Sequence, residues 1–260
     1  MQRGKEIKVE FVKDRLCVKI FDTRDEMGRA AAEDVAAAIK ECLSEKAEIN
    51  MIFAAAPSQN DMLYHLCIRE DIEWERINAF HMDEYIGLDP KAPQCFSNFL
   101  REHIFDKKPF KSVNLINAGA KSAKEECKRY AELLKKYPVD IVCMGIGENG
   151  HIAFNDPHVA DFSDTAHVKA VKLDGVCRMQ QVNDGCFDRL SDVPEYAMTV
   201  TVPGLMAARY NFCVVPAPTK ANAVKNTVYG EIGEWCPATA LRMKDGATLY
   251  CDADSAKYII

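Results

Sequence analysis

Long apolar runs are missing from this 260-residue sequence, and no stretch approaches the roughly 20 apolar residues of a membrane-spanning helix. The segment from Met1 to Lys8 is polar and charged, so we expect no secretory signal in it. The eleven cysteines form no CxxC pair, and no Cys/His cluster has zinc-binding spacing. We therefore expect a cytoplasmic protein with reduced cysteines, no metal site and no contact with membranes.

A block of positive charge is missing as well. The formal net charge is −6, from 33 basic and 39 acidic residues, and both signs are mixed along the chain. Nucleic-acid binding needs a basic face that displaces counterions, so this balance argues against a nucleic-acid partner. A local pocket with a few basic groups for one phosphate remains compatible with the total charge.

Strand-like and helix-like segments alternate along the whole chain. Apolar or alternating runs predict strands at 15–21, 49–55, 76–82, 112–116, 140–144, 197–202, 211–215 and 248–251. Helical periodicity predicts helices at 61–70, 97–104, 122–137 and 220–229, and one that follows a capping-box pattern at Thr23 and Glu26. This alternation indicates a single α/β domain over residues 1–260, with one doubly wound, mostly parallel, Rossmann-like sheet and helices on both faces.

Ligands bind such sheets beyond the carboxyl ends of the strands, near a switch in strand order. Asp83 directly follows the predicted strand at 76–82, where rigid backbone and partial burial suit a general base. The alternative interpretation of this segment is a solvated carboxylate that caps a turn.

A glycine-rich segment, 145–150, follows the strand at 140–144 and leads into His151, a residue type that commonly accepts and donates protons in catalysis. Five residues later, Asp156 can orient this imidazole and favour its charged form if the chain folds back. A nucleotide-binding glycine loop is the weaker alternative, because the third spaced glycine and a Walker lysine are both missing.

Two other strand ends offer groups for a phosphate. Ser58, Gln59 and Asn60 lead into a helix whose free N–H groups make a natural phosphate cradle, although ordinary helix capping by Ser58 or Asn60 also fits. Lys220 stands in the first turn of another predicted helix, where acidic residues are usually favoured. A lysine that reaches back to an anion explains this position, and a solvated surface lysine is the alternative. The four strand ends together indicate acid–base chemistry on a phosphorylated small molecule.

Two long motifs carry a family resemblance. The segment Phe80–Leu88, FHMDEYIGL, resembles the MDEYxGL motif of glucosamine-6-phosphate deaminases, and 145–157 resembles their GHIAFNEP segment. The order of the strands is similar over essentially the whole chain. The related 6-phosphogluconolactonases typically have an arginine where this chain has Tyr85, and their glycine loop continues as GHTASLFP, without an acid at the position of Asp156.

The resemblance implies isomerisation and deamination of an amino-sugar 6-phosphate, without metal or organic cofactor. It implies that Asp83 moves a proton between C2 and C1 of the open-chain sugar and that His151 opens the pyranose ring. Asn149 matches a position that helps to set this histidine, and Asp156 stands where the family usually has glutamate. Lys220 matches a lysine that binds the sugar phosphate.

The sequence departs from the family at the phosphate. The family's TGGTP-like or TGSTP-like loop reads Pro57-Ser58-Gln59-Asn60 here. A phosphate-binding arginine is missing from its expected place within 178–187, which leaves open whether Arg178 replaces it, and Asp184 would oppose a phosphate.

Several alternatives follow from these departures. Galactosamine 6-phosphate is a candidate substrate beside glucosamine 6-phosphate, and a 6-phosphogluconolactonase-type hydrolase is the second enzymatic interpretation. A non-catalytic sugar-phosphate sensor is disfavoured, because the chain is acidic and keeps both Asp83 and His151. The resemblance is also compatible with a homo-oligomer.

Overall fold

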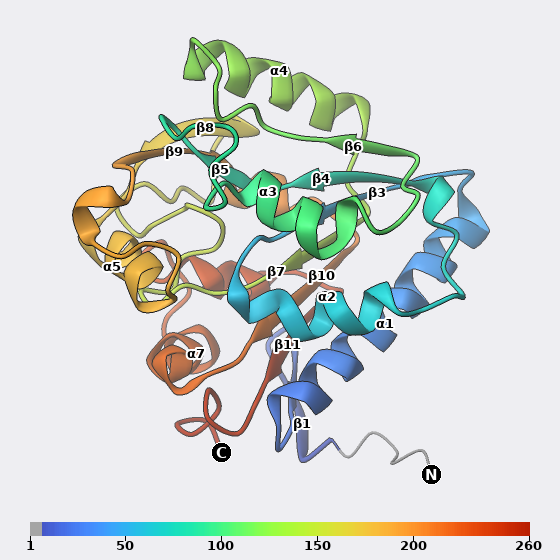
Figure 1. The fold of residues 1–260 in the computed structure, drawn as a ribbon. Coiled ribbons are helices and arrows are strands. Elements are labelled where there is room, and N and C mark those ends of the chain that lie inside the picture. Colours follow the sequence, from blue (N-terminus) through green and yellow to red (C-terminus); the bar gives the residue numbers. More distant parts are fainter. Residues whose placement is uncertain (1–6) are drawn as a thin grey trace.

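The computed structural model describes residues 7–260. Its larger sheet has eight strands in the order β1-β2-β11-β10-β7-β3-β4-β6 (Figure 1). In chain order these strands are β1 (Val9–Lys13), β2 (Leu16–Ile20), β3 (Ile49–Phe53), β4 (Ile77–His81), β6 (Ser112–Asn114), β7 (Ile141–Met144), β10 (Tyr210–Val215) and β11 (Ala247–Cys251). Only the β1–β2 pair is antiparallel, so the predicted fold class, a mostly parallel sheet with flanking helices, is confirmed.

A second, smaller sheet corrects the expectation of a single sheet. It has three antiparallel strands in the order β5-β9-β8, which are β5 (Asp83–Tyr85), β9 (Tyr196–Val200) and β8 (Val168–Lys172). The strand predicted at 197–202 forms but lies in this sheet. Strand β1 was also not predicted, because its side chains are mostly exposed on the edge of the large sheet and its sequence has no buried apolar run.

Helices cover both faces of the large sheet, as predicted. They are α1 (Arg24–Glu45), α2 (Asn60–Cys67), α3 (Phe96–Leu100), α4 (Ala123–Lys136), α5 (Gly175–Asn183), α6 (Val202–Met206) and α7 (Ala221–Tyr229). Short helical turns of other types lie at Pro57–Gln59, Trp74–Arg76, Arg101–Phe105, Leu190–Asp192, Pro218–Lys220 and Pro237–Met243. Within residues 7–260, no helix has the length and apolar character needed to cross a bilayer.

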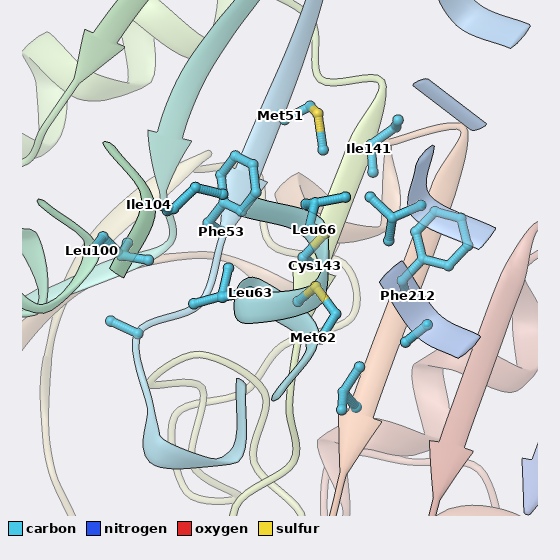
Figure 2. Close-up of a cluster of buried hydrophobic side chains, with 14 of the residues drawn as sticks. Met51, Phe53, Met62, Leu63, Leu66, Leu100, Ile104, Ile141, Cys143 and Phe212 are labelled. Atoms are coloured by element: carbon cyan, nitrogen blue, oxygen red, sulfur yellow. The ribbon is translucent and has the colours of Figure 1, made fainter. Parts of the chain in front are cut away.

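Two apolar clusters separate the helices by face. The first joins α1, α2 and α3 to one set of alternating strand side chains, and the second joins α4, α6 and α7 to the other set. Figure 2 shows part of the first cluster, where Met62 and Leu66 of α2 lie among strand residues such as Phe53, Cys143 and Phe212. Each aliphatic side chain buried in this way stabilises the fold by about 1.5–3 kcal/mol.

Helix α1 begins at the predicted capping box. The Thr23 hydroxyl accepts a hydrogen bond from the Glu26 N–H at 3.2 Å, and the Glu26 carboxylate accepts one from the Thr23 N–H at 3.2 Å. These reciprocal bonds satisfy N–H groups that a helix N-terminus would otherwise leave free. They fix the first turn of α1 directly beyond the carboxyl end of β2.

The order of the strands places the functional site. From β3 the chain builds β4 and β6 on one side, then returns to β7 on the other side and continues outward to β10 and β11. Strands β3 and β7 are therefore the point where the direction of winding reverses, which is where sheets of this kind bind ligands.

Candidate active site

A cavity lies at this reversal point. Its walls come from segments that follow β3, β4, β7 and β10, which include Ser58, Asp83, Gly147, His151 and Lys220. The four strand ends that were predicted separately to bear functional residues thus line one cavity. Apolar side chains, among them Met82, Phe96 and Phe154, complete the lining.

Asp83 follows β4 closely, as predicted, and begins β5 of the small sheet, so the alternative of a solvated loop carboxylate is wrong. Its backbone pairs with that of Thr199 in β9, and its side chain is 7% exposed at the cavity wall. Burial, helped by the negative charge of neighbouring Glu84, raises the pKa of Asp83 well above its ordinary value. A carboxyl group that holds its proton more tightly in this way is suited to take and return protons.

Glu84 fixes the backbone that carries Asp83. Its buried carboxylate accepts hydrogen bonds from the N–H groups of Tyr85, Phe96 and Ser97, at 2.9–3.1 Å. Burial raises the pKa of Glu84, although these three donors oppose that effect. The motif alone did not predict this positioning role of Glu84, because its three donors come from backbone that tertiary packing brings to it.

His151 is held on one side by a network of polar groups. Its Nδ1 lies 2.7 Å from Oδ1 of Asn149 and 3.1 Å from Oδ1 of Asp156. Both neighbours are hydrogen-bond acceptors, so we assign the proton to Nδ1, which leaves Nε2 free for a ligand. Asn149 Nδ2 in turn donates to Asp156 and to Asp174, each at 2.9 Å.

Asp156 is fully buried beneath this histidine. Burial would raise the pKa of Asp156, but the hydrogen bond and charge of His151, with donors from Asn149 and the Asp174 N–H, outweigh it and lower the pKa. The predicted contact between His151 and Asp156 is therefore present. Asn149 and Asp156 contact His151 but do not line the cavity wall, so they are placed to orient the histidine.

Gly147 allows the histidine to lie against the glycine-rich loop. A Cβ atom at this position would come within 2.0 Å of the His151 ring. Glycine is therefore required here by the close approach of the imidazole, in agreement with the glycine-rich pattern before His151.

The three residues predicted to form the phosphate loop lie in different surroundings. Ser58 lines the cavity, whereas Gln59 is buried behind it and donates from Nε2 to Ser58 Oγ at 3.0 Å and to the Val214 carbonyl at 3.2 Å. Asn60 is exposed and lines a different surface hollow, beside Tyr64. Asn60 is the first residue of α2 and does not line the cavity, so the structure gives no support to the prediction that it binds substrate. Neither Ser58 nor Asn60 makes a capping hydrogen bond.

Lys220 is buried, with 5% of its surface exposed, and its Nζ has no hydrogen-bond partner within residues 7–260. It ends a short 3-10 turn just before α7 rather than standing in the first α-helical turn. Burial lowers its pKa, while the charges of Asp184 and Glu148 oppose that effect. The alternative of a solvated surface lysine is excluded, and an unpaired buried ammonium at a cavity wall is suited to bind an anion.

Arg178 does not replace the missing phosphate arginine. Its Nη2 donates to the carbonyls of Leu190 and Val193, at 2.9 and 2.8 Å, and it lies outside the cavity wall. The side of the α5 region that faces the cavity presents Gln180, Gln181 and Asp184 instead. Arg24 was not predicted, and it lines the cavity from the start of α1. Its signal was its place just beyond the carboxyl end of β2, a strand end that was not among the four considered.

Two groups of potential metal ligands lie near the histidine. One is His151, Asp156 and Cys177, and the other is Asp156, His158 and Asp174. Both include Asp156, whose oxygens already accept hydrogen bonds from Asn149 and the Asp174 N–H. Burial raises the pKa of the Cys177 thiol well above its ordinary value, which disfavours the thiolate that a metal requires. In the second group, His158 Nε2 already lies 2.9 Å from the carbonyl oxygen of Lys172.

Comparison with known proteins agrees with this geometry. A family model for glucosamine-6-phosphate isomerases and 6-phosphogluconolactonase matches residues 22–250. The glucosamine-6-phosphate deaminase of Listeria monocytogenes serotype 4a is 32% identical over 212 residues, which cover 82% of this chain and 88% of the relative. The Bacillus cereus deaminase is 30% identical over 238 residues, which cover 92% of this chain and 87% of that one.

Solved structures give the same result. The structure of a monomeric glucosamine-6-phosphate deaminase matches with a TM-score of 0.83 at 26% identity, over 92% of this chain and 98% of that chain. The 6-phosphogluconolactonase from Shewanella baltica matches with a TM-score of 0.73 at 14% identity, over 90% and 96%, which shows a shared fold. This chain belongs to the family of glucosamine-6-phosphate isomerases and 6-phosphogluconolactonases.

Proposed function

We propose that this protein is a glucosamine-6-phosphate deaminase-type enzyme, which converts an amino-sugar 6-phosphate and water into a ketose 6-phosphate and ammonia. The observation that carries the proposal is the shared cavity of Asp83 and His151, in which one carboxyl group and one oriented imidazole face the same space. The deaminases named above are 26–32% identical to this chain, whereas the lactonase is 14% identical, which supports the deaminase reaction.

His151 acts first in the proposed reaction. Its free Nε2 accepts the proton of the hydroxyl on C1 and returns a proton to the ring oxygen, so that the C1–O5 bond breaks and the open-chain aldehyde forms. Asn149 and Asp156 hold the ring and stabilise the transient imidazolium.

Asp83 then moves a proton from C2 to C1. Removal of the C2 proton gives an enolamine, and return of a proton to C1 gives the 2-imine of the ketose. Water adds to this imine and ammonia leaves, so that atoms and charges balance without a redox partner. Because the pKa of Asp83 is raised, its carboxylate is a stronger base than an exposed aspartate.

The deciding experiment is an ammonia-release assay over a panel of hexosamine 6-phosphates, with the unphosphorylated sugars as controls. We expect ammonia together with a ketose 6-phosphate from the glucosamine or the galactosamine epimer. Hydrolysis of 6-phosphogluconolactone without any ammonia release would overturn the proposal and favour the lactonase. A cytoplasmic location, assembly into homo-oligomers and independence of cofactors remain predictions.

A further inference from the structure

Arg24 is a cavity residue that neither the motifs nor the proposed mechanism uses. It is the first residue of α1, and its side chain lines the same cavity as Ser58 and Lys220. Among the described residues of this cavity wall, Arg24 and Lys220 are the two lysine or arginine side chains. The start of a helix ordinarily favours acidic side chains, so an arginine here needs another source of stability.

Two hydrogen bonds, which we call the Arg24 clamp, hold the guanidinium in place. Arg24 Nε donates to the carboxylate of Asp61 on α2, and Arg24 Nη2 donates to the carbonyl of Pro57 in the loop after β3. These two bonds use one edge of the guanidinium. Within residues 7–260, Nη1 has no hydrogen bond of its own, so the other edge remains available to a ligand.

Close packing of α1 on α2 makes the clamp possible. A Cβ atom on Gly28, one turn after Arg24, would lie 2.4 Å from Cβ of Asp61. Only glycine lets Asp61 approach α1 closely enough to hold the arginine. The guanidinium is thus ordered before a ligand arrives, which reduces the entropy lost on binding.

The α5 side of the cavity presents a carboxylate, Asp184, whose charge also acts on Lys220. The α5 region contributes Gln180 and Asp184, and Gln180 Nε2 donates to the Asp184 carboxylate at 3.2 Å. Negative charge and amide groups therefore stand where the family resemblance led us to expect a phosphate-binding arginine. An anionic group of the substrate is attracted instead to Arg24 and Lys220.

We propose that Arg24 binds the substrate phosphate and takes the place of the arginine that the α5 segment lacks. The identity of the substrate rests on the function proposed above, whereas the affinity of this site for phosphate does not. The two are separated by measuring the binding of inorganic phosphate to the native protein, with no turnover involved.

The test compares Arg24→Ala, Arg24→Lys and Arg29→Ala. Arg29 lies on the same helix but outside the cavity wall, so its variant controls for loss of a positive charge on α1. We expect Arg24→Ala to weaken inorganic phosphate binding, followed by thermal shift and calorimetry, by about tenfold or more, which is the scale of one charge-assisted hydrogen bond. Arg24→Lys should recover part of the affinity, and Arg29→Ala should match the native protein.

Kinetics separate binding from a merely structural role. Arg24→Ala should raise KM for the hexosamine 6-phosphate by about tenfold or more with little change in kcat. A similar loss in kcat, or an equal loss with the unphosphorylated sugar, would show that the clamp only supports the fold and would overturn the proposal. Unchanged phosphate binding in Arg24→Ala would also overturn it. If the native protein binds phosphate through Arg24 but releases no ammonia, the proposed reaction fails and this site stands.

Discussion

The Nδ1 atom of His151 lies 2.7 Å from the side-chain oxygen of Asn149, two residues earlier in the chain. The same oxygen accepts the backbone N–H of His151 at 3.0 Å. Two bonds to one acceptor fix both the backbone and the ring of the histidine. They also fix the tautomer, so that Nε2 is the nitrogen that can exchange protons with a ligand.

His151→Gln should therefore slow turnover of the cyclic sugar strongly. Glutamine keeps hydrogen-bonding ability but cannot accept and return a proton near neutral pH. An open-chain substrate, or the reaction in reverse, should lose less activity because ring opening is then not limiting. Rates for both substrate types, measured on the same preparation, provide the check. Equal losses would favour a structural role for the histidine.

Gly147→Ala tests the fit of His151 against its loop. The added methyl group would lie 2.0 Å from the ring, so the imidazole must move. A displacement of about 1 Å at a reacting group lowers kcat by roughly 100-fold, and we expect a loss of that order. Gly175→Ala is the matched control, because open space surrounds that position. Full activity in Gly147→Ala would show that the ring position is not critical.

Asp83→Asn tests the proton carrier itself. The substitution keeps the size of the side chain and removes its basicity, so kcat should fall by roughly 10²–10⁴. Circular dichroism and the melting temperature establish that the variant is folded. Near-native turnover of ammonia by a folded Asp83→Asn protein would contradict the assignment.

The same variant should be more stable than the native protein at neutral pH. The pKa of Asp83 is raised on folding, so the folded state binds this proton more tightly than the unfolded chain. The free energy of unfolding therefore falls as pH rises above about 4, the ordinary value for aspartate. The neutral amide of the Asp83→Asn variant carries no such penalty, because it does not ionise in either state.

Melting curves from pH 4 to pH 8 measure this difference. Each kcal/mol gained corresponds to about 2–4 °C in Tm for a chain near this size. The advantage of Asp83→Asn should grow with pH and vanish near pH 4. A difference in Tm that does not depend on pH would mean that the carboxyl group titrates alike in the folded and unfolded states.

Much of this arrangement could be predicted from sequence because the central strands are short and wholly buried. Runs such as Ile49–Phe53 and Ile141–Met144 leave little alternative to a parallel sheet covered on both faces. The rule that ligands lie at the carboxyl ends of such strands then located Asp83, His151 and Lys220 on one cavity.

The remaining features depend on tertiary packing that leaves no periodic pattern. Strand β5 has three residues, and it forms because β9 pairs with it. Asn60 and Ser58 are both polar residues of the same segment, and the sequence does not distinguish them. Asn60 is exposed because α2 begins at this residue and leads away from the cavity. The clamp on Arg24 needs Asp61, which is 37 residues away in the chain.

Lys220→Ala addresses the anion directly. The ammonium group is buried and makes no hydrogen bond among residues 7–260. Its loss therefore breaks no hydrogen bond that stabilises the fold. A charge-assisted hydrogen bond to phosphate is worth about 1.5–3 kcal/mol, and KM should rise roughly 10- to 100-fold when it is lost.

The effect of Lys220→Ala on kcat should be small, because a phosphate remote from C1 and C2 is held alike in the ground state and the transition state. Removal of a desolvated cation should also raise Tm, since burial already lowers the pKa of Lys220 and disfavours its charged form. A higher Tm together with a higher KM would mean that the protein keeps this lysine for its ligand at the expense of stability. An unchanged KM, or equal activity on the unphosphorylated sugar, would refute the phosphate role and reopen the substrate class, while the chemistry of Asp83 and His151 would still stand.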